Sequence, residues 1–176
     1  MYTSTKYFHE IGPCAYRNWK SQTECYLLHG YCRSFKFVFG ANTLDKQNFV
    51  VDFGGLKEVK RQLEDWFDHT VILQSDDPLV HTFKTLEQNM YCRVRTFPII
   101  SCEGLAQWVA AYVDYMIQQR TSGRAWVISC EMIEAEKNTA LYTINRSDVD
   151  RITWLVLKQL NEEILSSSDK ISFDNL

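Results

Sequence analysis

Three separated parts of the chain carry side chains that could move protons. Cys25 stands four residues before His29, on a polar loop that leads into an expected strand. Asp68 and His69 are neighbours behind an expected helix, and Glu131 follows an apolar run. A thiolate can act as a base or nucleophile, and a carboxylate beside an imidazole can relay a proton. Together these residue types indicate an acid/base site.

Each residue taken alone is better explained by a role without chemistry. A cysteine such as Cys25 is usually inert, and a histidine such as His69 usually lies on the surface or near a helix end. Glu131 would ordinarily be solvated, although a carboxylate at a strand end can also accept two hydrogen bonds from an amidine-like ligand edge. The functional interpretation therefore depends on these residues occurring together.

Composition places the chain among globular proteins. Its 176 residues are 45% hydrophobic and 14% aromatic, which suffices for one folded domain with a core. The net charge is −3 and no basic stripe is present, so a nucleic-acid partner is not indicated. The first residues do not resemble a signal peptide, and no apolar run is long enough to span a bilayer. We therefore expect a cytoplasmic protein without a membrane partner.

The cysteines are expected to be free thiols. There are six of them, no C-x-x-C pair is present, and no export signal suggests an oxidising compartment. Most of them fit buried positions as small apolar side chains. They are Cys14, Cys25, Cys32, Cys92, Cys102 and Cys130.

Hydrophobic periodicity predicts an α+β domain with an antiparallel sheet. The clearest strand signal is the alternation of Phe35, Phe37 and Phe39. Asp52 and Ser101 can each cap a following helix. The expected strands are 5–11, 29–39, 92–97, 125–130 and 139–144, with an extended segment at 49–52, and the expected helices are 54–66, 79–88 and 102–119.

The C-terminal part differs in character. Ser147 can cap a further amphipathic helix over 148–165, and a polar tail follows it. We therefore divide the chain into a domain over 1–145 and a helical extension with a tail over 146–176.

Several short segments, in order and with similar gaps, resemble the 6-pyruvoyl-tetrahydropterin synthase and 6-carboxy-tetrahydropterin synthase family. The resemblance runs from about Tyr7 to Tyr142 and omits the C-terminal helix. The segments are Cys14-Ala15-Tyr16-Arg17, Cys25 to Tyr31, Asp52 to Lys57, Phe67-Asp68-His69, Cys102 to Trp108, Cys130-Glu131 and Ala140-Leu141-Tyr142.

The resemblance implies a tunnelling fold (T-fold), with a four-stranded antiparallel sheet and helices on one face. It also implies self-association into a trimer or hexamer, with active sites between subunits. The implied small-molecule substrate is a pterin, 7,8-dihydroneopterin triphosphate. The reaction of the carboxy branch feeds 7-deazaguanine synthesis (queuosine and preQ0), and that of the pyruvoyl branch feeds biopterin synthesis.

The resemblance also implies roles for individual residues. Cys25 would be the general base or acid, with Asp68 and His69 as its relay partners. Glu131 would anchor the pterin ring, helped by Glu103. A carboxylate suits this task because the amino and N–H edge of a pterin is a bidentate donor.

The chain departs from the family at the metal. The family holds zinc with three histidines, and zinc polarises the side-chain hydroxyls of the substrate. Here only His29 is kept, since Tyr16 and Tyr31 occupy the other two positions. A neutral phenol is a poor zinc ligand.

Two outcomes remain open for the metal. One is a rebuilt zinc site that recruits Cys14, which would share a face with Tyr16 in an extended segment, or His9; Cys32 fits less well because it points to the opposite face. The simpler one is loss of the metal.

Two functions of different class follow. The first is a divergent dihydroneopterin triphosphate lyase that keeps Cys25, Asp68 and His69 for proton transfer. The second is a non-catalytic protein that binds a pterin- or purine-like ligand in a pocket without the metal. The presence of the thiol together with its relay favours the enzyme, because simple binding does not require them.

Overall fold

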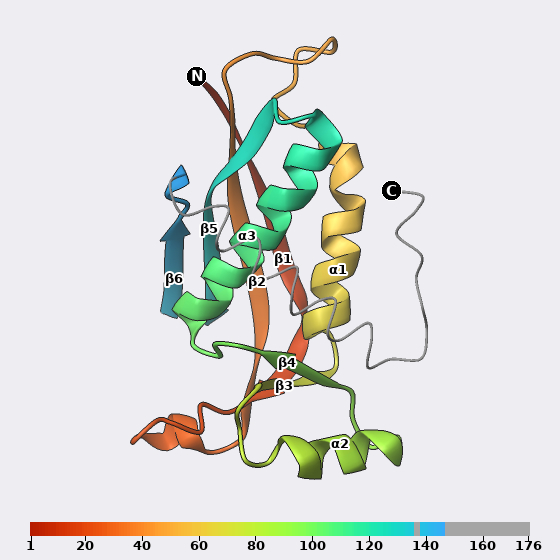
Figure 1. Ribbon diagram of the computed structural model, residues 1–176, viewed down its shortest axis with the longest axis vertical. Coiled ribbons are helices and arrows are strands. Elements are labelled where there is room, and N and C mark those ends of the chain that lie inside the picture. Colours follow the sequence, from red (N-terminus) through yellow and green to blue (C-terminus); the bar gives the residue numbers. More distant parts are fainter. Residues whose placement is uncertain (136–137, 147–176) are drawn as a thin grey trace.

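The computed structural model describes residues 1–135 and 138–146 (Figure 1). The expected C-terminal helix over 148–165 and its tail lie outside the described residues. No helix in the described part of the chain is both long and apolar enough to cross a membrane. All six cysteines are free thiols.

The centre of the fold is a six-stranded mixed sheet with the order β4-β3-β1-β2-β5-β6. The strands β1, β2, β5 and β6 pair antiparallel, whereas β3 pairs parallel with both β1 and β4. The strands are β1 (Tyr2–Tyr16), β2 (His29–Ala41), β3 (Thr70–Gln74), β4 (Val94–Phe97), β5 (Ala125–Ala135) and β6 (Asn138–Thr143).

The prediction of a purely antiparallel four-stranded sheet is therefore wrong. The prediction missed strand β3, which has five residues. Its sequence shows no alternation of apolar and polar residues, because the neighbouring residues Ile72 and Leu73 are both buried. It joins β1 in parallel, with Cys14 opposite Thr70, and it carries β4 on its other side. A parallel pair needs a crossover connection between its strands, and for β3 and β4 the helix α2 provides this connection. The expected extended segment at 49–52 forms no strand.

Helices α1 (Lys57–Phe67) and α3 (Cys102–Thr121) cover the same face of the sheet, as expected, while α2 (Val80–Gln88) lies beyond its end (Figure 1). Ser101 caps α3 by accepting a hydrogen bond from the Gly104 N–H group at 3.1 Å. Asp52 likewise caps η2 (Phe53–Leu56), the short 3₁₀ turn that leads into α1. Both caps follow the preference of serine and aspartate for this position.

The core lies between the sheet and these two helices. Phe35, Phe37 and Phe39 are fully buried on the helix-covered face of β2, which confirms the predicted alternation. Phe67 at the end of α1 stacks on Phe97 of β4, with ring centroids 5.7 Å apart. The buried aromatic rings thus join α1 to both halves of the sheet.

A buried carboxylate fastens α3 to β5. Asp114 Oδ1 accepts a hydrogen bond from the Val127 N–H group at 2.7 Å, and both terminal nitrogens of Arg146 lie 2.9 Å from the carboxylate. The Asp114 side chain is 1% exposed. A carboxylate this deep is tolerated only because all its acceptor capacity is used.

Replacing Asp114 by alanine should lower the free energy of unfolding by about 2–4 kcal/mol, because a buried backbone N–H group loses its acceptor and an ion pair is broken. Urea unfolding followed by circular dichroism measures this change. Asp65→Ala is the matched control, since that side chain is half exposed in its pair with Arg95 and its loss should change little. Equal effects of the two substitutions would contradict the structural role of Asp114.

Candidate functional site

The pairing of β1 with β2 gathers the three positions where the resemblance expects zinc ligands. Tyr16 lies opposite His29, and Cys14 lies opposite Tyr31. The rings of Tyr16 and His29 are 4.3 Å apart between centroids, and Tyr31 lies 6.1 Å from the first ring and 5.6 Å from the second. The three side chains therefore form one cluster, as the family pattern requires, but with two phenols in it.

A buried ion pair that the sequence analysis missed completes this cluster. Arg33, two residues beyond Tyr31 on β2, is fully buried, with its guanidinium carbon 4.5 Å from the centroid of the Tyr16 ring. The Tyr16 hydroxyl donates to Glu134 Oε1 at 2.6 Å, and Arg33 Nη1 lies 3.4 Å from the same oxygen. A signal for Arg33 was present, because it stands in phase with Phe35 and Phe37 on the inward face of the strand.

Burial keeps the Tyr16 phenol and the Cys14 thiol beside Arg33 uncharged. It raises the pKa of the Tyr16 phenol well above its ordinary value, and the hydrogen bond to the Glu134 carboxylate raises it further. Burial also raises the pKa of the Cys14 thiol, although the nearby Arg33 charge acts in the opposite direction. Glu134 therefore carries the negative charge that balances Arg33.

A cavity of about 400 Å³ opens beside this cluster and contains two of the predicted site residues, Cys25 and Glu103. They reach it from different elements, since Cys25 lies in the η1 turn (Glu24–Tyr26) and Glu103 in the first turn of α3. Tyr16 and Glu134 face the same space. The lining residues are Tyr16, Asn18, Cys25, Ser101, Cys102, Glu103, Glu134, Asn138 and Thr139.

The loop that carries Cys25 is held by the connection between β3 and α2. Arg17 donates to both carboxylate oxygens of Asp77, at 2.8 and 3.2 Å, and both side chains are buried. The Arg17 guanidinium also lies 4.7 Å from the Tyr26 ring centroid, next to Cys25 in the chain. Asp77, in the connection between β3 and α2, thus supports the loop of the candidate site.

Asp68 and His69 contact each other but lie outside this cavity. His69 Nδ1 is 2.6 Å from Asp68 Oδ1, and the imidazole is 73% exposed. The backbone of His69 has a φ of 54°, and its N–H group donates to the carbonyl of Pro13 at 2.8 Å. Within one chain the structure therefore forms the carboxylate–imidazole pair and does not bring it into the cavity with Cys25.

Glu131 also lies outside the cavity. It stands between the buried residues Cys130 and Met132 on β5, and its side chain is directed to the other face, 3.5 Å from the ammonium group of Lys36. Glu134, three residues further along β5, is the carboxylate of this strand that faces the cavity. Ordinary strand alternation accounts for this difference, because Glu134 is in phase with the buried Cys130 and Met132, whereas Glu131 points to the other face.

The side chains in the cluster do not fit the family's zinc site. In the described part of the chain, no three histidine, cysteine, aspartate or glutamate side chains are grouped so that they could hold a metal ion. Two of the three family positions are neutral phenols, and a guanidinium stands against one of them. Among the candidate replacement ligands, the buried Cys14 thiol donates to the Tyr31 carbonyl, His9 is exposed beside Glu10, and Cys32 is exposed. None of them forms a metal-holding group with His29 in the described residues.

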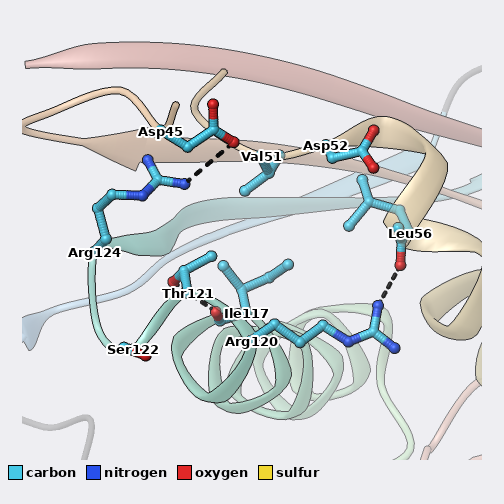
Figure 2. A pocket seen from close by; sticks show the side chains of 10 residues that line it. Asp45, Val51, Asp52, Leu56, Ile117, Arg120, Thr121, Ser122 and Arg124 are labelled. Atoms are coloured by element: carbon cyan, nitrogen blue, oxygen red, sulfur yellow. Dashed lines mark hydrogen bonds and ion pairs between the residues drawn. The ribbon is translucent and has the colours of Figure 1, made fainter. Parts of the chain in front are cut away.

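A second cavity, of about 370 Å³, lies between the end of α3 and the segment 45–56 (Figure 2). Its charged groups are already used in structural contacts. Arg120 donates to the Gly55 carbonyl, and Arg124 donates to the Val50 carbonyl at 2.9 Å and lies 3.9 Å from Asp45. These contacts fasten the loop to α3 and give no arrangement for chemistry.

The chain resembles known proteins of one family over most of its length. The family model for 6-pyruvoyl tetrahydropterin synthase matches residues 13–146. The chain belongs to this family. A 6-carboxy-5,6,7,8-tetrahydropterin synthase of Aquifex aeolicus is 25% identical over 127 residues, which is 70% of this chain and 78% of that protein. The enzyme of the same name from Rickettsia felis is 40% identical over 57 residues, 32% of this chain and 41% of that protein.

Solved structures share the fold of this tetrahydropterin synthase family member. An uncharacterized protein of Wolinella succinogenes has a TM-score of 0.69 at 21% identity, covering 82% of this chain and 98% of that chain. The 6-pyruvoyltetrahydropterin synthase of Plasmodium vivax has a TM-score of 0.59 at 15% identity, with 82% and 99% covered. At these identities the likeness concerns the fold alone.

The two thiols of the cavity should differ in reactivity. Burial raises the pKa of the Cys102 thiol to about 11, so about one thousandth of it is thiolate at pH 8. Cys25 is exposed. Iodoacetamide at pH 8 should therefore modify Cys25 well before Cys102, and the rate at Cys102 should rise about tenfold per pH unit up to about pH 11. Peptide mass mapping measures both rates, and faster labelling of Cys102 at pH 8 would contradict the raised pKa of this partly buried thiol.

Proposed function

We propose that this protein is a divergent dihydroneopterin triphosphate lyase of the 6-carboxy-tetrahydropterin synthase type, acting in 7-deazaguanine synthesis. The observation that supports it most is the cavity in which Cys25 and Glu103 meet, in a chain that belongs to this family. A thiol and a carboxylate on one cavity are the groups that proton transfer and pterin anchoring require.

The lining of the cavity suits the ring of a pterin better than its phosphates. It offers the carboxylates of Glu103 and Glu134, with hydroxyl and amide groups between them, and no lysine or arginine is among the lining residues that the structure describes. Because Glu134 is already paired with Tyr16 and Arg33, we assign the anchoring of the amino and N–H edge to Glu103. A triphosphate group would have to be bound by residues outside the described lining.

In the proposed reaction Cys25 transfers protons at the side-chain carbons of the substrate, and the Asp68–His69 pair serves as its relay. Since that pair is preformed and exposed but lies outside the cavity, we propose that a second copy of the chain supplies it. This matches the expectation that active sites of the family lie between subunits. Glu131, directed to the other face of the sheet, would likewise act from a neighbouring subunit.

Triphosphate release from 7,8-dihydroneopterin triphosphate tests the lyase. The wild-type protein should release it, and Cys25→Ala should lower the rate by about 10²–10⁴-fold, the usual contribution of a general base. Cys32→Ala is the control, because that thiol is also exposed but lies outside the cavity. Equal turnover by wild type and Cys25→Ala would refute the role of this thiol.

The same assay can locate the relay. His69→Ala should be inactive alone, and co-expressed Cys25→Ala and His69→Ala chains should regain part of the activity, because some mixed sites then contain both intact groups. Inactive single variants together with an inactive mixture, with wild type active, would place the relay within one chain. An active His69→Ala variant would place the relay outside this pair.

A second function, a pterin- or purine-like binding protein without turnover, is favoured by one observation. Tyr16 and Arg33 stand where the family places zinc chemistry, and the cavity remains open beside them. Such a protein would bind the ring through Glu103 and would not need Cys25. It predicts ligand binding that is unchanged by Cys25→Ala and no release of triphosphate.

Calorimetric titration with a pterin distinguishes the contributions of Glu103 and Glu131, the two carboxylates that the family pattern suggests as ligand anchors. Glu103→Gln should weaken binding by about 10–100-fold, since a charge-assisted pair of hydrogen bonds is lost. Glu131→Gln is the comparison, with its thermal unfolding as the control for folding. Loss of binding in Glu131→Gln alone would show that Glu131, reaching the site from a neighbouring subunit, anchors the ring in place of Glu103.

A further inference from the structure

Arg33 carries a permanent positive charge into the interior of the protein. Its side chain is fully buried, and its Nε and Nη2 atoms have no hydrogen-bond partner in the part of the chain that the structure describes. Its carboxylate contact is Glu134 Oε1, at 3.4 Å from Nη1. A buried guanidinium is costly unless a compensating charge is fixed beside it, so Arg33 and Glu134 are best understood as one unit.

This unit lies against the positions of the family's metal ligands. The Arg33 guanidinium lies 4.5 Å from the Tyr16 ring, and that ring contacts His29. The Tyr16 hydroxyl, the atom that would have to turn towards a metal, instead donates its proton to Glu134 at 2.6 Å. Arg33 therefore already supplies the positive charge of the cluster. The Tyr16 hydroxyl already has Glu134 as its partner.

We propose that the Arg33 guanidinium has taken the place of the family's metal ion as the positive charge of this site, so that the cavity works without a metal. The proposal goes beyond the function proposed above, because it holds equally for a lyase and for a binding protein. A divalent ion held by these positions would face a like charge at short range in a medium of low polarisability, which opposes its binding.

The same arrangement gives Tyr16 a role towards the ligand. Its proton is directed to Glu134, so the phenol oxygen is left as an acceptor at the wall of the cavity. An acceptor there suits a hydroxyl or N–H group of a neutral ligand. The Arg33–Glu134 unit would fix the orientation of this phenol.

Zinc binding by reverted proteins tests the proposal independently of turnover. Three proteins are dialysed with zinc chloride, and bound metal is measured by mass spectrometry and by competition with a chromogenic chelator. They are the wild type, Tyr16→His/Tyr31→His, and Tyr16→His/Tyr31→His/Arg33→Met. The first two should hold no stoichiometric zinc, and the third should bind zinc at least about 100-fold more tightly than the second, because the like charge has been removed.

Tyr16→His/Tyr31→His/Arg124→Met is the matched control, since Arg124 is a partly buried arginine outside the cluster and should not confer zinc binding. If circular dichroism shows that removing Arg33 alone prevents folding, adding Glu134→Gln removes the unpaired charge and allows the same measurement. Stoichiometric zinc in the wild type, or equal affinity in the double and triple variants, would overturn the proposal. Zinc binding by none of the variants would also overturn it, because Arg33 would then not be what excludes the metal.

Discussion

The antiparallel pairing of β1 with β2 is the constraint on which the site depends. It places Tyr16 opposite His29 and Cys14 opposite Tyr31, although these residues come from segments separated by the Cys25 loop. A slip of one residue would turn every side chain of one strand to the other face. The fully buried Phe35, Phe37 and Phe39 prevent such a slip, because it would expose them. The core thus fixes the register, and the register fixes the site.

The irregularity in β1 extends this constraint to the Asp68–His69 pair. The pairing of β1 with β2 shifts between Phe8 and Gly12, and Gly12 has a φ of 155°. A Cβ atom at Gly12 would collide with the Asp68 side chain, so only glycine allows α1 to end this close to the strand. The conformation of β1 and the place of the acidic relay residue are therefore coupled.

The parts of the fold with strong periodic signals were predictable, and those set by distant pairing were not. The alternating phenylalanines of β2 and the serine-capped helix α3 are local patterns, and both were predicted. Strand β3 was missed because a five-residue run without alternation owes its structure to parallel partners on both sides. The contact of Arg17 with Asp77 could not be inferred either, because the two residues lie 60 positions apart.

The site shows the same division, and it explains why the metal question needed the structure. The family pattern identified Cys25 and Glu103, which do share a cavity, and it identified Tyr16 and Tyr31 as unsuitable zinc ligands. It gave no information on what balances the charge there, because Glu134 reaches Tyr16 across 118 residues of sequence.

With Cys14 and Cys102 kept as thiols by burial, Arg33 and Glu134 are the charged pair at the centre of the cluster. Adding a dication to such a balanced pair would leave a net positive charge in a buried place, which is unfavourable. Restoring the two histidines would therefore restore nitrogen ligands for a metal. It would not remove the Arg33 charge that opposes the binding of a metal ion. For this reason the replacement of two histidines by Tyr16 and Tyr31 is best regarded, together with the Arg33 charge, as one change in the electrostatics of the site.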